Sequence, residues 1–372
     1  MFEFLKLNQK AFGLEITDTA VRLEQLAKRQ NRIVQRRTFS ASLDKGIVSG
    51  GEIKNESELA KIIKRGIKEK KINAKLAAVS LPEEKTFLKI IKMPAMPLEN
   101  LSQAIVYEAE NYIPLSLENV YLDFEIIDGK LSSNNKNNKN DTKNVSDNFE
   151  VLLTAVPRTV VDSYVSALIT AGLTPFILEP EAQAIARSIA AKKTLNNSVL
   201  IIHIGDSKTT LIFYSANTIR FTYTIPISNI YFNEVIAKNA GVPPERAEYF
   251  KNAYGISINS VKSTNANSEQ ESILRQKIFE SLIPGLIDFI QQVAKCVSYY
   301  KTHYDVSAKQ PQKIILCGAG SRLNGLGDFI SLKLDLPVFE NPDQSLINAV
   351  GGDFTVAHGL ALRALSESRA IQ

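Results

Sequence analysis

Two short polar turns, far apart in the sequence, carry the residues with the clearest potential for chemistry. The first lies within Phe12–Arg22 and the second within Ile201–Leu211, and apolar strands flank both. Exposed backbone N–H groups in tight turns bind anions, so two such turns can hold one polyphosphate between them. The duplicated unit therefore indicates two half-molecules that grip a shared polyphosphate.

Alternating apolar residues and turn signals predict the elements that would position these turns. We expect three antiparallel strands over 11–42 and a second meander of three strands over 198–226. An amphipathic helix is predicted over 55–71, followed by a buried strand over 77–81. Each half-molecule is thus expected to contain a mixed sheet.

Three further segments are distinctive. Lys313–Cys317 is typical of a buried strand, and it leads into the glycine turn Gly318–Gly325, where a nucleotide commonly lies in an open α/β sheet. Pro284 is expected to kink a long helix over 273–304 or to divide it into two. The polar tract 131–148 has almost nothing to bury, which predicts a disordered surface loop.

Composition limits the class of protein. With 372 residues, 44% apolar and 22% charged, the chain is expected to fold as a soluble globular protein with two domains or lobes. No apolar run is long enough to span a bilayer. Cys296 and Cys317 are expected to be reduced core thiols.

Net charge is +5, and basic residues cluster at 28–37 and 61–75. Attraction to an anionic membrane face or to nucleic acid is one interpretation of these clusters, and a solvated surface is the other. In 61–75 the apolar stripe of the helix favours the solvated surface.

The order of these segments resembles the PilM family of actin-like type IV pilus assembly proteins over almost the whole chain. The most specific matching motifs are Lys92-Met-Pro94, Glu108–Pro114, Ala171-Gly-Leu173, Glu181-Ala182 and Gly359–Arg363. The resemblance implies an α/β, actin-like ATPase fold of two lobes, IA and IIA, each with a mixed five-stranded sheet, and two inserted subdomains, IC and IIB.

The resemblance also implies where the domains begin and end. Lobe IA would comprise 1–81 and 149–197 with a C-terminal helix over 353–368, and IC would comprise 82–148. Lobe IIA would comprise 198–240 and 300–352, and IIB would comprise 241–299.

At the first turn the family pattern is Asp-Ile-Gly-x-Ser-x-x-Lys. By resemblance, Asp18, Thr19 and Arg22 would contact phosphate, with the Arg22 cation clamping the charge. Glu15 stands in place of the aspartate, and Thr17 in place of the glycine. A β-branched residue does not readily take positive φ or let a phosphate approach its backbone.

At the second turn the resemblance assigns Gly205, Asp206, Ser207 and Lys208 to phosphate binding. His203 replaces the carboxylate that the family would use for Mg²⁺, and a neutral imidazole is a poor ligand for so hard a cation. A histidine bonded locally at a strand end explains His203 equally well. We expect binding to persist while turnover falls.

Five more residues would contact the nucleoside by resemblance: Glu248, Lys251, Gly318, Gly320 and Arg322. Two simpler interpretations remain open. Glu248 and Lys251 could form a surface i,i+3 ion pair, and the two glycines could merely make their turn.

The expected function is that of a cytoplasmic scaffold, with ATP and Mg²⁺ as the implied cofactors. The resemblance implies a groove between IA and IC for the cytoplasmic tail of PilN, contacts with other inner-membrane pilus assembly proteins, and a peripheral position at the inner face of the membrane. Nucleic acid binding and direct membrane insertion are not expected. At most a weak ATPase is anticipated.

Four other functions compete with this scaffold. One is an adaptor whose nucleotide cleft is vestigial. A filament protein resembling FtsA would end in an amphipathic membrane helix, and a secretion protein resembling GspL would continue into a transmembrane helix; the sequence has neither pattern. A sugar or acetate kinase would need a carboxylate base facing its substrate, and none is evident.

Overall fold

The fold is described from a computed structural model of the chain, which covers residues 10–30, 32–94, 96–128, 148–190, 198–257, 269–304, 310–340 and 353–370. The chain forms two compact units. The large unit comprises Met1–Glu84 and Ser166–Gln372, and the insert unit comprises Lys85–Val165.

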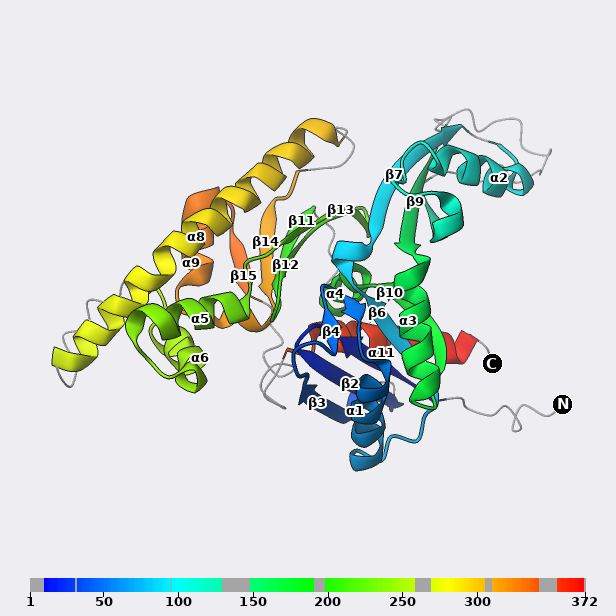
Figure 1. Cartoon of the computed structure of the whole chain (residues 1–372). Coiled ribbons are helices and arrows are strands. Elements are labelled where there is room, and N and C mark those ends of the chain that lie inside the picture. Colours follow the sequence, from blue (N-terminus) through cyan, green and yellow to red (C-terminus); the bar gives the residue numbers. More distant parts are fainter. Residues whose placement is uncertain are drawn as a thin grey trace. The chain divides into compact units, whose positions relative to one another are not determined.

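The first sheet of the large unit has five strands in the order β10-β6-β1-β2-β3 (Figure 1). Its antiparallel meander pairs β1 with β2 and β2 with β3, and β6 runs parallel to both β1 and β10. The strands are β1 (Ala11–Ile16), β2 (Ala20–Arg29), β3 (Arg32–Ser42), β6 (Leu76–Leu81) and β10 (Thr174–Pro180). The predicted meander and the predicted buried strand are confirmed.

Helices cover this sheet. Helix α1 (Glu56–Glu69) begins where the Asn55 side chain accepts a hydrogen bond from the backbone N–H of Glu58, 3.1 Å away. Its buried residues Leu59 and Ile63 form the apolar stripe that predicted the helix. Helix α11 (Thr355–Ala370) packs against β1, β2 and β6, and it also contacts α4 (Glu181–Ala190).

The second sheet repeats the same arrangement, in the order β13-β12-β11-β14-β15. Its meander is again antiparallel, and β14 runs parallel to β11 and to β15. The strands are β11 (Val199–Ile204), β12 (Thr209–Ser215), β13 (Thr218–Ile225), β14 (Lys313–Cys317) and β15 (Val338–Glu340). Two mixed five-stranded sheets, as expected from the resemblance, are therefore present.

An apolar core lies between this sheet and its helices. From the helices it includes the buried residues Phe232, Ile236, Leu286 and Phe289. The helices are α5 (Asn229–Ala240), α6 (Pro244–Ala253), α8 (Glu269–His303) and α9 (Leu326–Leu334). Helix α8 continues through Pro284, so this proline does not divide it into two.

The insert unit is a three-stranded antiparallel sheet in the order β7-β9-β8, with its own apolar core. Its strands are β7 (Phe87–Pro94), β8 (Val120–Asp128) and β9 (Asn148–Pro157), and α2 (Leu98–Ala109) packs on them. Helix α3 (Arg158–Thr170) leads back to the large unit.

One boundary differs from the sequence expectation, which assigned 149–197 to the first lobe. Strand β9 pairs with both β7 and β8, so Asn148–Pro157 lies in the sheet of the insert unit. An apolar alternation identifies a strand but not the sheet that it joins. The expected disordered loop over 131–148 lies, except for Asn148, outside the described residues.

The remaining short elements are β4 (Val48–Ser49), β5 (Glu52–Ile53), η2 (Glu83–Lys85), η3 (Leu117–Asn119) and η4 (Ala319–Arg322). Among the described helices, none combines the length and the apolar composition needed to cross a bilayer. Cys296 and Cys317 are both buried and free, as expected for core thiols.

Candidate nucleotide-binding site

The first turn joins β1 to β2 and is closed by the side chain of Thr17. Its Oγ1 accepts hydrogen bonds from the backbone N–H groups of Ala20, at 3.0 Å, and Thr19, at 3.3 Å. The backbone N–H of Thr17 donates to the carbonyl of Ala20 at 2.9 Å. Thr17 does not adopt a positive φ, so a β-branched residue fits this turn without backbone strain.

Asp18 and Thr19 are engaged within the large unit's own backbone. The Asp18 carboxylate accepts hydrogen bonds from the N–H groups of Gly50 and Gly51, at 2.8 and 2.9 Å. The carbonyl of Thr19 accepts from the N–H of Leu43 at 2.8 Å, and its hydroxyl lies 3.4 Å from that of Thr17. These two predicted residues hold the turn in place.

Arg22 is the cation of the first turn, and it is buried between carboxylates from both sheets. Its Nη1 lies 3.3 Å from Oε1 of Glu15, and its Nη2 pairs with Asp206 in the second turn. Burial raises the pKa of Glu15 to about 8, an effect that the charge of Arg22 only partly opposes. At neutral pH Glu15 is therefore mostly protonated, and Asp206 is the charged partner of Arg22.

The second turn joins β11 to β12 and is closed by the backbone. The N–H of Gly205 donates to the carbonyl of Lys208 at 2.9 Å, and the carbonyls of Gly205 and Asp206 accept from the start of α5. Ser207 is partly buried in the same turn. Because two carbonyls of the turn accept hydrogen bonds from the first N–H groups of α5, the helix and the turn stabilise each other.

Lys208 of the second turn also forms ion pairs, with carboxylates that lie next to the first sheet. Its Nζ pairs with Glu84 and lies 3.0 Å from Oε2 of Glu181, and these carboxylates follow β6 and β10 of the first sheet. Crossed ion pairs, which run in opposite directions, therefore hold the second turn against the first sheet and the segments that follow its strands. Arg22 reaches from the first turn to the second, and Lys208 reaches from the second to Glu84 and Glu181.

Sequence reasoning missed the carboxylates that face Lys208. Glu181 was recognised only as part of a family motif, and burial raises its pKa. Glu83 is buried beside it and accepts a hydrogen bond from the N–H of Ala182 at 3.0 Å. Burial raises the pKa of Glu83 to about 7. The two consecutive glutamates that closely follow the buried strand, Glu83 and Glu84, were the available signal.

His203 lies at the end of β11, and its Nε2 is 2.8 Å from Oδ2 of Asp353. Both side chains are buried. Burial alone would lower the pKa of His203, but the Asp353 carboxylate outweighs it and raises that pKa. Asp353 also accepts from the N–H of Thr355 at 3.0 Å, where α11 begins. The local-bonding interpretation of His203 is thus supported, and Asp353 is a second residue that the sequence did not reveal.

The residues expected to contact the nucleoside fall into two groups. Glu248 forms a 3.0 Å ion pair with Arg322 of η4. Lys251 is fully buried, and its Nζ donates to Oδ1 of Asn229. Burial lowers the pKa of Lys251 to about 8. The alternative of a surface ion pair between Glu248 and Lys251 is therefore wrong.

Asn229 connects these groups to the turns. Its Nδ2 lies 3.5 Å from Oδ1 of Asp206, and its Oδ1 accepts from Lys251. A continuous polar network thus runs from Arg22 through Asp206 and Asn229 to Lys251.

Gly318 and Gly320 bring η4 close to the end of β11. A Cβ on Gly318, which has φ +95°, would lie 2.4 Å from the carbonyl oxygen of Ile204. A Cβ on Gly320 would lie 2.2 Å from a methyl carbon of the same residue. Close packing of the protein against itself is sufficient to require both glycines.

The arrangement fits phosphate only if its ion pairs open. Arg22 and Lys208 are the cations that could hold phosphate, and each already contacts carboxylates. Over the described ranges, no group of three or more His, Cys, Asp or Glu residues could hold a metal ion. With His203 bonded to Asp353 and Glu15 mostly protonated, these side chains do not fit a directly bound Mg²⁺.

Solved structures share this fold. A PilM-PilN type IV pilus biogenesis complex matches with a TM-score of 0.75 and 23% identity, covering 96% of this chain and 99% of that chain. MreB5 of Spiroplasma citri bound to ADP matches with a TM-score of 0.55 and 12% identity, over 98% of both chains. EutJ of Carboxydothermus hydrogenoformans, an ethanolamine utilization protein, matches with a TM-score of 0.52 and 13% identity, covering 94% of this chain and 88% of that chain. The expected actin-like fold is confirmed.

The sequence itself also matches a family. The model of the family described as "Type IV pilus assembly protein PilM" covers residues 13–365. That range includes both lobes, the insert unit and both turns. The chain therefore belongs to the PilM family of type IV pilus assembly proteins.

Proposed function

We propose that this protein is a cytoplasmic scaffold of type IV pilus assembly, which docks the cytoplasmic tail of a PilN-like inner-membrane protein and binds ATP between its lobes. The family match over 13–365 carries the proposal. The fold likeness to a PilM-PilN complex supports it. Docking to that tail would hold the protein at the inner face of the membrane, beside other pilus assembly proteins.

The docking part of the proposal is supported by the surface of the insert unit. Within a short stretch, large apolar side chains are exposed: Val106, Tyr107, Tyr112 and Leu115, with Tyr107 at 75%. Single exposed apolar residues need no explanation, but a close group of them is typical of a protein-binding surface. Apolar anchors of a peptide tail would bury this group.

A tail peptide tests the docking. A peptide of a PilN-like cytoplasmic tail should bind the purified protein, and Tyr107→Ser with Leu115→Ser should weaken that binding about tenfold or more. Tyr249→Ser is the matched control, because Tyr249 is also exposed, at 61%, but lies on α6. No affinity better than millimolar, or equal loss in the control, would contradict the docking.

The nucleotide part of the proposal uses the crossed ion pairs. The phosphates of ATP would replace Asp206 on Arg22 and would replace Glu84 and Glu181 on Lys208, since phosphate and carboxylate bind guanidinium and ammonium groups alike. Gly205 and Ser207 would border the phosphates, and Glu248, Lys251 and Arg322 would lie toward the nucleoside. A fold neighbour, MreB5 of Spiroplasma citri, was solved bound to ADP, which supports nucleotide binding by this fold.

Because Asp206 competes with phosphate, Asp206→Asn should raise the affinity for ATP about tenfold, and Arg22→Met should abolish binding. Asp328→Asn is the control, since it removes an exposed carboxylate from α9. Isothermal titration with ATP and with AMP measures the effect. If the wild type and Asp206→Asn both fail to bind at millimolar ATP, the cleft is vestigial and the protein is an adaptor that does not use nucleotide.

A further inference from the structure

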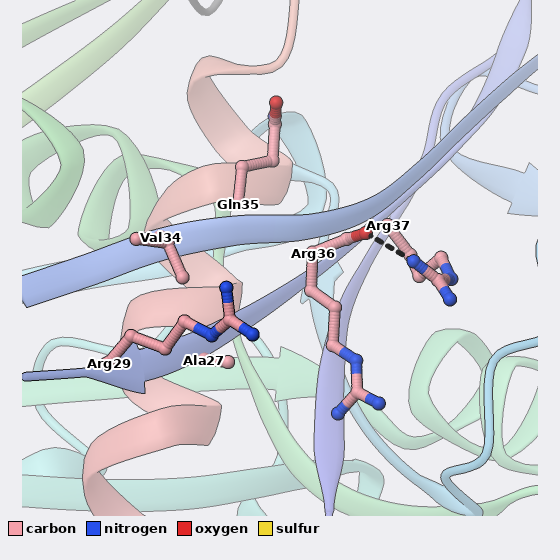
Figure 2. Close-up of a pocket in the computed structure, with 6 residues that line it drawn as sticks. All are labelled: Ala27, Arg29, Val34, Gln35, Arg36 and Arg37. Carbon is pink, nitrogen blue, oxygen red and sulfur yellow. Dashed lines mark hydrogen bonds between the residues drawn. The ribbon is translucent and has the colours of Figure 1, made fainter.

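The hairpin of β2 and β3 carries a basic pocket that the proposed function does not use. Its lining residues are Ala27, Arg29, Val34, Gln35, Arg36 and Arg37, and its volume is about 540 Å³ (Figure 2). Between positions 28 and 37 the sequence has five cations and no acidic residue. The lining of the pocket therefore combines two small apolar side chains with three arginines.

A β-bulge gathers these arginines. The register of β2 with β3 pairs Gln25 with Arg37 and Leu26 with Gln35, so Arg36 is the extra residue. Such a bulge re-aims the side chain that it inserts. Figure 2 shows Arg36 pointing away from Gln35, whose side chain lies on the other side of the strand.

The same register places the other lining residues. Arg37 shares a face of the sheet with Phe39, because side chains two apart in a strand point the same way. Helix α1 covers that face at Phe39, where Gly66 packs against the ring. The helix ends at Glu69, and the arginines further along β3 are exposed.

The arginines lack acidic partners within the part of the chain that the structure describes. No carboxylate there pairs with Arg29, Arg36 or Arg37. One Arg37 nitrogen donates to the backbone carbonyl of Arg36 at 2.9 Å. The only acidic residue of the two strands, Glu24, accepts from Gln35 at 3.0 Å and contacts His358, so it serves the opposite face. These arginines contrast with Arg22, Arg187, Arg322 and Arg363, which all pair with carboxylates.

Strand β3 also has a free edge. It is the last strand in the order β10-β6-β1-β2-β3, and no other described strand pairs with its outer side. An edge strand presents a row of backbone N–H and C=O groups to any extended chain that lies beside it. Pairing with a second copy of β3 is disfavoured, because it would bring the cations of two hairpins together.

We propose that this hairpin binds an acidic polypeptide segment in extended conformation. The segment would add to the edge of β3 by backbone hydrogen bonds, the mode known as β-augmentation. Its alternate side chains, spaced by about 6.8 Å on one face, would place carboxylates against Arg29, Arg36 and Arg37. Single-stranded nucleic acid is a poorer match, because the pocket has no aromatic side chain on which a base could stack.

A synthetic peptide tests this directly. The probe is a nine-residue peptide with Glu at every second position and Val between, labelled for fluorescence anisotropy. It should bind with an affinity that falls as salt is raised, and Arg29→Ser with Arg36→Ser should weaken it by about a hundredfold, or tenfold per lost charge-assisted contact. Lys295→Ser with Lys301→Ser is the control, because it removes equal charge from exposed positions of α8 and should change little.

Two further probes separate the mechanism from general charge attraction. Two versions of the same peptide are N-methylated, one at the odd-numbered residues and the other at the even-numbered residues. Only one of these sets has its N–H groups facing β3, so only one methylated peptide should lose binding. Equal binding by both methylated peptides, or by the arginine variant, overturns the proposal. Arginine-dependent binding to phosphatidylglycerol vesicles without binding to the peptide also overturns it, and assigns the hairpin to a membrane surface.

Discussion

The turn between β1 and β2 in the first lobe and the turn between β11 and β12 in the second lobe share one closing backbone hydrogen bond, from Thr17 to Ala20 and from Gly205 to Lys208, both at 2.9 Å. The first turn differs in that Thr17 Oγ1 also accepts hydrogen bonds from the N–H groups of Thr19 and Ala20. The two sheets nevertheless have the same strand order and directions. A shared topology therefore does not fix how each turn is made.

The charges of the two turns differ in a complementary way. The first supplies the Arg22 cation, and the second supplies both the Asp206 carboxylate and the Lys208 cation. Each lobe thus satisfies the other through crossed pairs. The cations that are suited to bind phosphate, Arg22 and Lys208, therefore form the ion pairs that connect the lobes.

The largest effect is expected from breaking one crossed pair. Arg22→Met removes the cation that lies between Glu15 and Asp206, and it should lower the free energy of unfolding by about 3 to 4 kcal/mol, because the Asp206 carboxylate is left without its cation. Urea unfolding measures this. Lys54→Met is the control, since its pair with Glu52 is exposed and should be worth less than about 1 kcal/mol. Equal losses would show that the crossed pair does not stabilise the fold.

The segments after the central parallel strands offer a second comparison. In the first lobe β6 is followed by Pro82 and η2, and in the second lobe β14 is followed by Gly318. Gly318→Ala should cost about 3 kcal/mol, because it combines a positive φ with a 2.4 Å approach to the Ile204 carbonyl.

Gly205→Ala provides the contrast for the same unfolding measurement. Its nearest neighbour would be the Lys208 carbonyl oxygen at 3.1 Å, so it should cost less than about 1 kcal/mol. If Gly205→Ala proved the more costly of the two, the second turn would be the more constrained element.

The strand-end residues Glu15 and His203 occupy matching places in the two lobes, and Glu15 makes stability depend on pH. Its pKa is about 8 in the folded protein against 4.5 when unperturbed. A raised pKa gives stability that is complete below pH 4.5 and is lost as pH rises through 8.

Between pH 5 and pH 8 the wild type should therefore lose about 3 to 3.5 kcal/mol more stability than Glu15→Gln. His203 and Glu83 also have raised pKa values, so the variant retains part of the slope. Chemical unfolding at several pH values checks this. An unchanged slope in Glu15→Gln would mean that the carboxyl is charged across the range.

Much of the fold followed from the sequence, because its signals are local. The alternation in 11–42 and the apolar stripe in 55–71 each act within a few residues, and both elements formed where expected. Local signals could not identify the sheet that Asn148–Pro157 joins. Its partner strands β7 and β8 come earlier in the sequence, and the segment 129–147 separates them from β9.

The site was less predictable for the same reason. Arg22 meets Asp206 across 184 positions, and His203 meets Asp353 across 150. A cation in a turn looks available to a ligand until its partner is known. Resemblance supplied the right neighbourhood of residues, but only tertiary contacts show that Asp18 caps a loop at Gly50 and Gly51.

The smallest expected effect comes from making the first turn like the second. Thr17→Gly removes the hydroxyl that accepts from Ala20 and Thr19 and adds backbone freedom, so it should destabilise the protein by about 1 kcal/mol. Thr17→Ser keeps the hydroxyl and should restore most of that loss in thermal unfolding. The glycine would also open the turn to a phosphate, so ATP affinity should rise in Thr17→Gly and stay unchanged in Thr17→Ser. A rise in both variants would mean that the methyl group, and not the closing hydrogen bonds, keeps phosphate from the first turn.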